Sequence, residues 1–165
     1  MKKLIEIKKK LANDWFKSLQ EKMIYQFQLL ENEISKKKGR KTKYFIKREW
    51  KKNNKKEGGG TSYLLRDGEI FDKVGINQST VSGKFEKVFR SKVLGSEKNG
   101  KYWASGISVV AHMKNPKIPA FHFNTRFIVT SKSWFGGGMD ATPTFDDKKE
   151  KKFIHQKLKT TCKLN

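Results

Sequence analysis

The stretch FHFNTRFIV, residues 121–129, carries the side chains of this sequence that are best suited to chemistry. Aromatic and β-branched residues dominate it, which predicts a β-strand whose residues two apart share a face. His122, Asn124 and Arg126 then lie on one face, and the opposite face is the mainly apolar set Phe121, Phe123, Thr125, Phe127 and Val129. Imidazole can move a proton, an amide can donate and accept hydrogen bonds, and guanidinium binds carboxylates bidentately. The polar row is therefore either the solvated face of an antiparallel sheet or one wall of a ligand site.

A second predicted strand, WASGISVVAH at residues 103–112, precedes this one by an eight-residue connection that contains two prolines. Strands this close in sequence usually pair in antiparallel fashion. Ser108 and His112 share a face of the first strand. If the polar faces of the two strands coincide, Ser108, His112, His122, Asn124 and Arg126 form one patch.

Asp140 follows three consecutive glycines, Gly136, Gly137 and Gly138, within the segment SWFGGGMDATPTF at residues 133–145. Glycine allows a sharp turn or the close approach of a ligand to the backbone, and a flexible loop explains the run equally well. The run is not a phosphate-binding loop, because no Lys-Ser or Lys-Thr pair follows it. We expect a turn-rich segment here, with a carboxylate placed to accept hydrogen bonds from N–H groups.

All three histidines, His112, His122 and His155, lie in the second half of the chain. Imidazole is a common metal ligand, but this spacing is not diagnostic, and structural roles explain the three residues as well. Cys162, on the last predicted helix, is expected to be a core residue rather than a nucleophile. As the only cysteine, it excludes an internal disulfide.

The elements that position these residues can be read from hydrophobic periodicity and turn residues. Residues 1–35 are predicted to form a long helix, whose apolar side chains recur at steps of three and four. These are Leu4, Ile7, Leu11, Trp15, Leu19, Met23, Phe27, Leu30 and Ile34. We expect strands and loops over residues 42–129 and a final helix over residues 146–163.

Within the strand region, residues 42–50 are predicted to form a strand, and Asp67-Gly68 between two apolar runs predicts a hairpin. Residues 75–100 are rich in Gly, Ser and Lys and are expected to be irregular, with a short helix near residues 84–89. Helix, mostly antiparallel strands and helix again indicate a single domain of the α+β class.

The formal net charge of +22 is the extreme feature of the composition. It favours a polyanionic partner, and a non-catalytic, basic nucleic-acid-binding protein is the alternative function. Against that alternative, 33 of the 38 basic residues are lysine, whereas specific nucleic-acid contacts rely on arginine. The positive charge can equally reflect biased composition. The start MKKLIEIKKK reads as neither a signal peptide nor an anchor, and no segment is apolar enough to span a membrane, so we expect a cytoplasmic protein.

Three blocks of the sequence resemble the oxygen-dependent coproporphyrinogen III oxidases, in the order and spacing of that family. They are GGGTSYLLRDGEIFDKVGIN at 58–77, SGISVVAHMKNPKIPAFHFNTRFI at 105–128 and WFGGGMDATPTF at 134–145. The resemblance implies a large, flat antiparallel sheet flanked by helices on both sides, in a cytoplasmic homodimer. It also implies oxidative decarboxylation of coproporphyrinogen III to protoporphyrinogen IX in haem biosynthesis, with molecular oxygen as co-substrate and no organic cofactor. Nucleic acid is not a partner in this interpretation.

The resemblance also implies roles for individual residues. Ser108, Asn124, Thr125 and Arg126 match substrate contacts, and Arg126 suits a propionate because its guanidinium fork meets a carboxylate. His122 matches a proton donor, and Asp140 matches a carboxylate that faces the pyrrole N–H groups. His112, His122 and His155 match positions proposed as divalent-metal ligands in some bacterial members, which makes a manganese or magnesium site a further expectation.

The resemblance begins near residue 11 and runs to the end of the sequence. The proteins of that family are much longer, and later blocks are absent here, among them a Gly-Gly-Arg substrate contact. The sequence is therefore expected to correspond to the N-terminal part of the enzyme, which need not be active alone.

Overall fold

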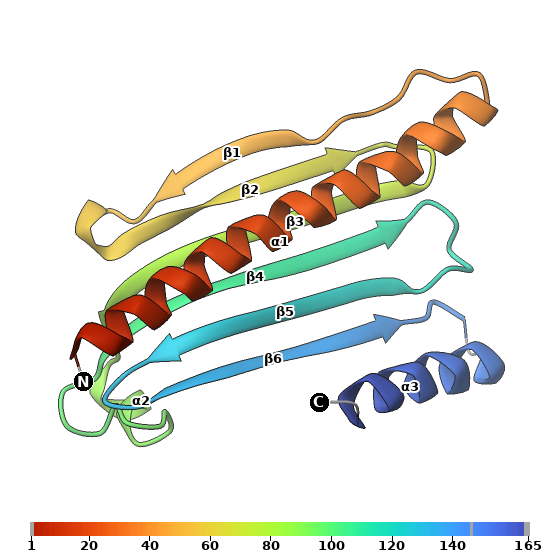
Figure 1. Cartoon of the computed structure of the whole chain (residues 1–165). Coiled ribbons are helices and arrows are strands. Elements are labelled where there is room, and N and C mark those ends of the chain that lie inside the picture. Colours follow the sequence, from red (N-terminus) through yellow and green to blue (C-terminus); the bar gives the residue numbers. More distant parts are fainter. Residues whose placement is uncertain (1, 146, 164–165) are drawn as a thin grey trace.

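The computed structural model describes residues 2–145 and 147–163, and it contains one six-stranded antiparallel sheet with helices (Figure 1). Each strand pairs with the next along the chain, in the order β1-β2-β3-β4-β5-β6. The strands are β1 (Ile46–Lys51), β2 (Gly58–Arg66), β3 (Phe71–Lys84), β4 (Lys101–Met113), β5 (Ala120–Val129) and β6 (Ser133–Thr142). The helices are α1 (Lys2–Lys37), α2 (Lys87–Arg90) and α3 (Lys148–Lys163), with a 3-10 turn η1 (Lys55–Glu57) before β2. The α+β class is confirmed.

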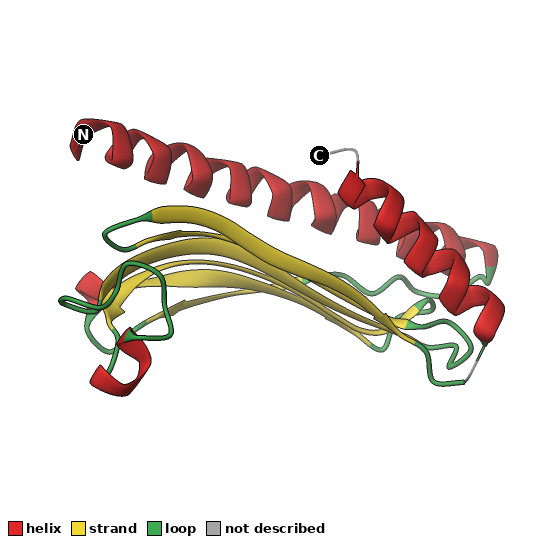
Figure 2. Ribbon diagram, turned by 90° about the horizontal axis from the view of Figure 1, so that it is seen from below, coloured by secondary structure: helices red, strands yellow, loops and turns green. Residues whose placement is uncertain are grey.

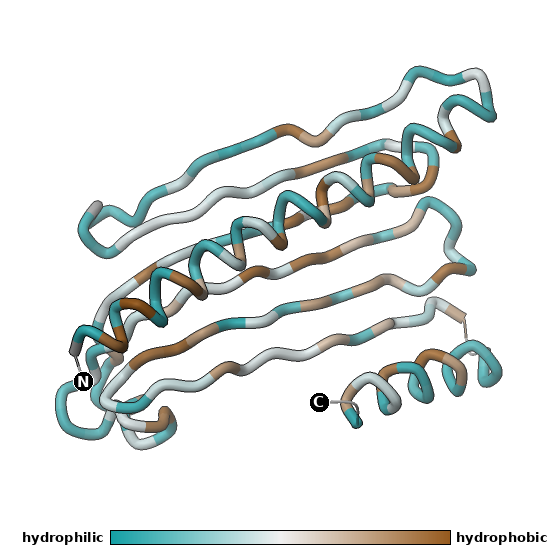
Figure 3. Tube along the Cα trace, in the orientation of Figure 1, coloured by the Kyte–Doolittle hydropathy of each residue, from teal (hydrophilic) through white to brown (hydrophobic). Residues whose placement is uncertain are grey.

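The core lies between α1 and one face of the sheet, along which the helix runs for its whole length (Figures 1 and 2). Apolar residues recur along α1 and through β4 and β5, whereas β1 is mostly hydrophilic (Figure 3). The buried apolar residues are Ala12, Phe16, Leu65, Phe71, Val74, Ile76, Ile107, Val109, Ala111, Phe127 and Val129. Burial of these side chains is what holds a helix of this length against the sheet.

The prediction that the apolar series of α1 faces the core is only partly correct. Leu19, Met23 and Phe27 pack against the core, but the earlier members of the series are exposed. Leu11 is 63% exposed and Trp15 is 53% exposed, whereas the adjacent Phe16 is fully buried. The apolar stripe of the first half of α1 therefore faces away from the sheet centre, and a narrower line through Ala12 and Phe16 makes the contact.

The second half of α1 is joined to the β2–β3 hairpin by a buried carboxylate. Glu31 accepts hydrogen bonds from the backbone N–H groups of Glu69 and Ile70, the latter at 3.1 Å, and from the Ser35 hydroxyl at 3.3 Å. The predicted hairpin is confirmed: Asp67 adopts a left-handed φ of 55°, and a Cβ on Gly68 would lie 2.6 Å from the Glu31 carboxylate. Only glycine at position 68 therefore lets the turn approach the helix closely.

Two segments that the sequence predicts to be irregular are regular strands. Residues 75–84, the start of the segment 75–100 that was expected to be irregular, belong to β3, the longest strand. Residues 133–142 form β6 instead of a turn-rich segment. Gly137 of β6 sits opposite Thr125, and a Cβ on it would lie 2.3 Å from the Asn124 carbonyl oxygen. The glycines therefore permit close strand pairing here and do not mark a turn.

The face of the sheet opposite α1 is called the open face below. Within the described residues no long helix covers it, although the loop that carries α2 projects to that side at one end (Figure 2). α3 lies beyond β6, with none of its described residues buried (Figure 1). The expectation of helices on both faces is thus met on one face, by α1. Across the residues described, no helix has the length and hydropathy required to cross a membrane.

Candidate functional site

The open face carries a row of polar side chains that crosses the sheet from β1 to β5. In the strand register each of its members lies directly opposite the next. From β1 to β6 the row is Arg48, Ser62, Asn77, Ser108, Asn124 and Gly138. The expected antiparallel pairing of the two strands is confirmed, and it places Ser108 directly opposite Asn124. The row extends the expected patch over three further strands.

His122 and Asp140 lie opposite each other on β5 and β6, at the β6 side of the open face. The His122 Nδ1 atom is 3.8 Å from the Asp140 Oδ2 atom, and the same carboxylate oxygen accepts a 2.9 Å hydrogen bond from the Thr142 hydroxyl. His112 of β4 packs edge-to-face against His122, with ring centroids 5.8 Å apart. Two imidazoles and a carboxylate within this reach can accept, hold and return a proton at the sheet surface.

Arg126 points across the open face from β5, and Asn124 orients it. The Arg126 Nη1 group donates a 2.7 Å hydrogen bond to the Asn124 Oδ1 atom. Arg126 also lines a hollow of about 390 Å³ that continues across β4, β3 and β2 to Trp50, past Ser108, Asn77 and Ser62. In the described part of the chain the guanidinium forms no ion pair, so the positive charge facing this hollow has no protein counter-charge.

Glycines keep the β5–β6 side of the open face flat. Gly136 and Gly138 lie opposite Arg126 and Asn124, and their missing side chains would point to the open side. A Cβ on Gly138 would meet no atom within 4 Å, and one on Gly136 would come no nearer than 3.9 Å to Trp134. A broad, flat ligand could therefore lie against this part of the sheet between the polar groups.

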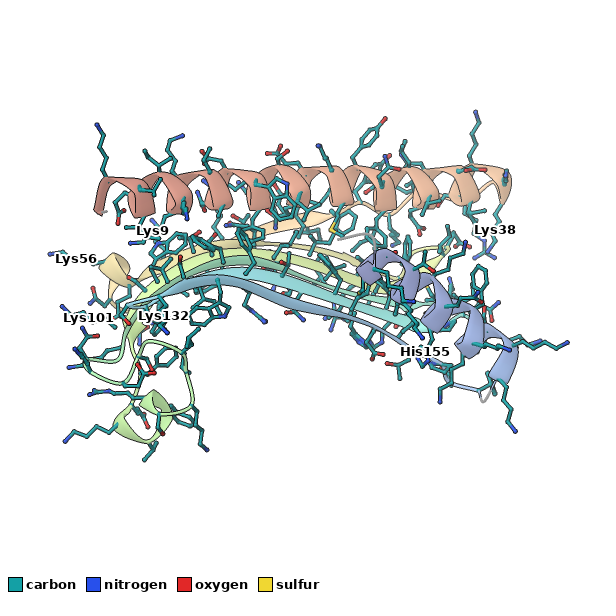
Figure 4. The ribbon with its side chains drawn as sticks, turned by 60° about the horizontal axis from the view of Figure 1, so that its bottom comes forward. Lys9, Lys38, Lys56, Lys101, Lys132 and His155 are labelled. Carbon is teal, nitrogen blue, oxygen red and sulfur yellow. The ribbon has the colours of Figure 1, made fainter. Side chains whose placement is uncertain are left out.

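Two predicted site residues are not brought to this patch. Thr125 alternates to the α1 side, where it lines a separate groove with Leu11 and Phe135. His155 lies on α3, beyond the edge of the sheet (Figure 4), in a lysine-rich setting with Lys152 and Lys159.

The described residues bring together two of the three histidines predicted to bind a metal, His112 and His122. Among residues 2–145 and 147–163, no cluster of three or more His, Cys, Asp or Glu side chains is placed to hold a metal ion. The predicted three-histidine site is therefore not assembled among the residues that the structure describes.

Sequence reasoning missed the contributions of the first three strands to the open face. Arg48, Ser62 and Asn77 are far apart in sequence and are aligned only by the pairing of β1, β2 and β3. The alternation within each strand is visible in the sequence, but the register that joins them is not.

Comparison with known proteins assigns the chain to a family. Residues 12–165 match the family model described as coproporphyrinogen III oxidase. The chain is 46% identical to the protein named oxygen-dependent coproporphyrinogen-III oxidase of Rickettsia typhi, and equally to that of Rickettsia prowazekii. In both cases the match covers 93% of this chain and 54% of the relative. The protein of that name from Rickettsia bellii is 44% identical over similar shares. The chain thus spans about half the length of these relatives, and it belongs to the coproporphyrinogen III oxidase family.

Proposed function

We propose that the open face binds coproporphyrinogen III and takes part in its oxidative decarboxylation to protoporphyrinogen IX with molecular oxygen. The proposal is carried by the His122–Asp140 pair, which lies beside the flat, glycine-bearing surface and Arg126. The Arg126 guanidinium can bind a carboxylate. Family membership of residues 12–165 supports the same reaction.

The chemistry requires electrons to leave the substrate and protons to be moved. Conversion of one propionate to a vinyl group releases carbon dioxide, a proton and two electrons. Two such conversions provide the four electrons that reduce one oxygen molecule to two molecules of water, with four protons consumed. Two of those protons come from the substrate, so the site must deliver two more.

Asp140 and His122 have complementary roles in this scheme. Asp140 accepts hydrogen bonds from pyrrole N–H groups and stabilises the positive character that develops on the ring as electrons leave. His122, with its Nδ1 atom 3.8 Å from that carboxylate, donates protons toward reduced oxygen. Ser108 and Asn124 orient the macrocycle, and Arg126 holds a propionate by a bidentate contact.

Thr125 has no side-chain contact with the substrate in this proposal, because its side chain lines the groove on the α1 side. The resemblance to the family further supports a homodimer that acts in the cytoplasm.

The test uses the purified 165-residue protein and begins without oxygen. Coproporphyrinogen III is bound under nitrogen and measured by equilibrium dialysis, oxygen is then admitted, and vinyl products are followed by chromatography. We expect binding and product with the wild-type chain, and a loss of about 100-fold or more in turnover with Asp140→Asn, the scale of a lost acid–base group. The matched control is Asp14→Asn on α1, where the carboxylate pairs with Lys10 on the helix surface.

Undiminished turnover by Asp140→Asn would refute the role of Asp140. Binding without product from the wild-type chain would leave the ligand assignment standing and overturn the reaction for this chain. Absence of binding would overturn both.

A further inference from the structure

A second basic corner lies on the open face, diagonally across from Arg126. Arg66 of β2 and Lys73 of β3 are directly opposite each other in the strand register, and both are exposed. Together with Arg48 they line a hollow of about 540 Å³, which we call the far basic hollow. Trp50, Ser62 and Asn77 line both this hollow and the one at Arg126, so the two are neighbours on one surface.

The pairing of Arg66 with Lys73 is unfavourable without an anion. Like charges directly opposite each other on one face of an antiparallel pair repel, because their Cβ atoms are only about 5 Å apart. Neither side chain, nor that of Arg48, forms an ion pair in the part of the chain that the structure describes. On β4, the residue opposite Lys73 is His112 and not an acid. Glu49, an acid that also lines the hollow, forms its ion pair with Lys47 of β1. A bound carboxylate would relieve this repulsion.

The separation of the two corners sets the size of the ligand that can reach both. With strands about 4.8 Å apart and about 6.7 Å per two residues, Arg126 lies roughly 22–25 Å from Lys73 and Arg66 at the backbone, since the register separates them along the strands as well as across two or three strands. Arg126 lines one hollow, Arg66 and Lys73 line its neighbour, and each side chain extends several ångströms from the backbone. A ligand that bridges the two corners is therefore roughly 10–15 Å across and carries acidic groups on opposite edges.

We propose that Arg66 and Lys73, with Arg48 beside them, form a second carboxylate subsite that binds the propionates on the edge of the macrocycle opposite Arg126. This inference rests on the proposed function, since it takes coproporphyrinogen III as the ligand. The subsite would then serve substrate recognition. A porphyrin with acidic groups on both edges is held at both corners, whereas a porphyrin with acidic groups on one edge is held at a single corner.

The test compares two fluorescent probes, coproporphyrin III with four propionates and mesoporphyrin IX with two. Each is titrated into the wild-type chain and into Arg66→Gln/Lys73→Gln. We expect the double variant to bind coproporphyrin III at least tenfold more weakly, as for the loss of a charge-assisted contact, and to bind mesoporphyrin IX with little change. The control is Lys47→Gln/Lys51→Gln, which removes the same charge from β1 positions that alternate with Arg48 and lie on the other face.

Each outcome decides between the subsite and the proposed function. Equal weakening of both probes, or equal weakening by the control, would show a general charge effect and overturn the subsite. If Arg126→Gln weakens coproporphyrin III while the Arg66/Lys73 double variant does not, the subsite is wrong and the proposed function stands. If the wild-type chain binds neither probe, the ligand assignment fails with it. Both altered residues are exposed, so the variants should fold, which circular dichroism checks.

Discussion

At the scale of single residues, the site depends on alternation along strands, and the sequence shows this alternation directly. His122, Asn124 and Arg126 were predicted to share a face, and they do, with Arg126 hydrogen-bonded to Asn124. The same rule places Thr125 on the opposite side, although the resemblance to the family assigns it to the substrate. The position of Asp140 opposite His122 could not be predicted, because three glycines made its segment look like a turn.

Gly138 gives a prediction at this scale, because its missing side chain keeps the open face flat beside Asn124. Gly138→Val should weaken coproporphyrin III binding at least tenfold by occupying the ligand's place, while the thermal stability stays the same or rises, since valine favours strands. Fluorescence titration and thermal melting measure the two effects. Ser133→Val, on the α1 side of the same strand, is the matched control. Unchanged binding by Gly138→Val would mean that the ligand does not lie on this part of the sheet.

At the scale of elements, helix and hairpin positions were largely predictable, and the packing of α1 was not. Apolar residues at steps of three and four identify the helix. They do not show which line of residues is buried when apolar residues lie on several sides of the helix. Phe16 was not among the residues expected to face the core, yet it is fully buried, and Trp15 beside it is 53% exposed. Residues 75–84 of β3 were expected to be irregular because Gly, Ser and Asn have low strand propensity. Pairing with β2 on one side and β4 on the other overrides this low propensity.

The neighbouring aromatic residues Phe16 and Trp15 make the packing of α1 testable. Phe16→Ala should lower the free energy of unfolding by about 3–5 kcal/mol, the cost of an emptied core site. Trp15→Ala should cost much less, because more than half of that side chain is already in water. Urea denaturation followed by circular dichroism measures both. Equal losses, or a larger loss at Trp15, would contradict the observed rotation of α1 about its axis.

At the scale of the whole molecule, apolar surface remains exposed on the α1 side near β6. Leu11, Trp15 and Phe135 line a groove of about 590 Å³ there, and Phe135 is 62% exposed. Apolar patches of this kind are uncommon on soluble monomers and usually mark contact surfaces. The match to the Rickettsia typhi relative covers only 54% of the length of that protein.

This groove should bind an apolar dye. We expect the fluorescence of anilinonaphthalene sulfonate to rise with the native chain, and the rise to fall by more than half in Leu11→Ser/Trp15→Gln. Val88→Ser/Phe89→Ser, which alters exposed apolar residues of α2 at the other side of the sheet, is the control and should have little effect. Equal dye binding by the groove variant and the wild type would show that the dye binds elsewhere.

The central claim is that the open face is the porphyrinogen site, and the three histidines test it most directly. With ¹⁵N-labelled imidazoles, nuclear magnetic resonance observes His112 and His122 on the open face and His155 on α3 in one spectrum. A bound porphyrin ring shifts the signals of nearby nuclei strongly. We predict that coproporphyrin III shifts the His112 and His122 signals and leaves the His155 signal in place. A shift of His155 alone, or no shift at saturating porphyrin, would contradict the claim.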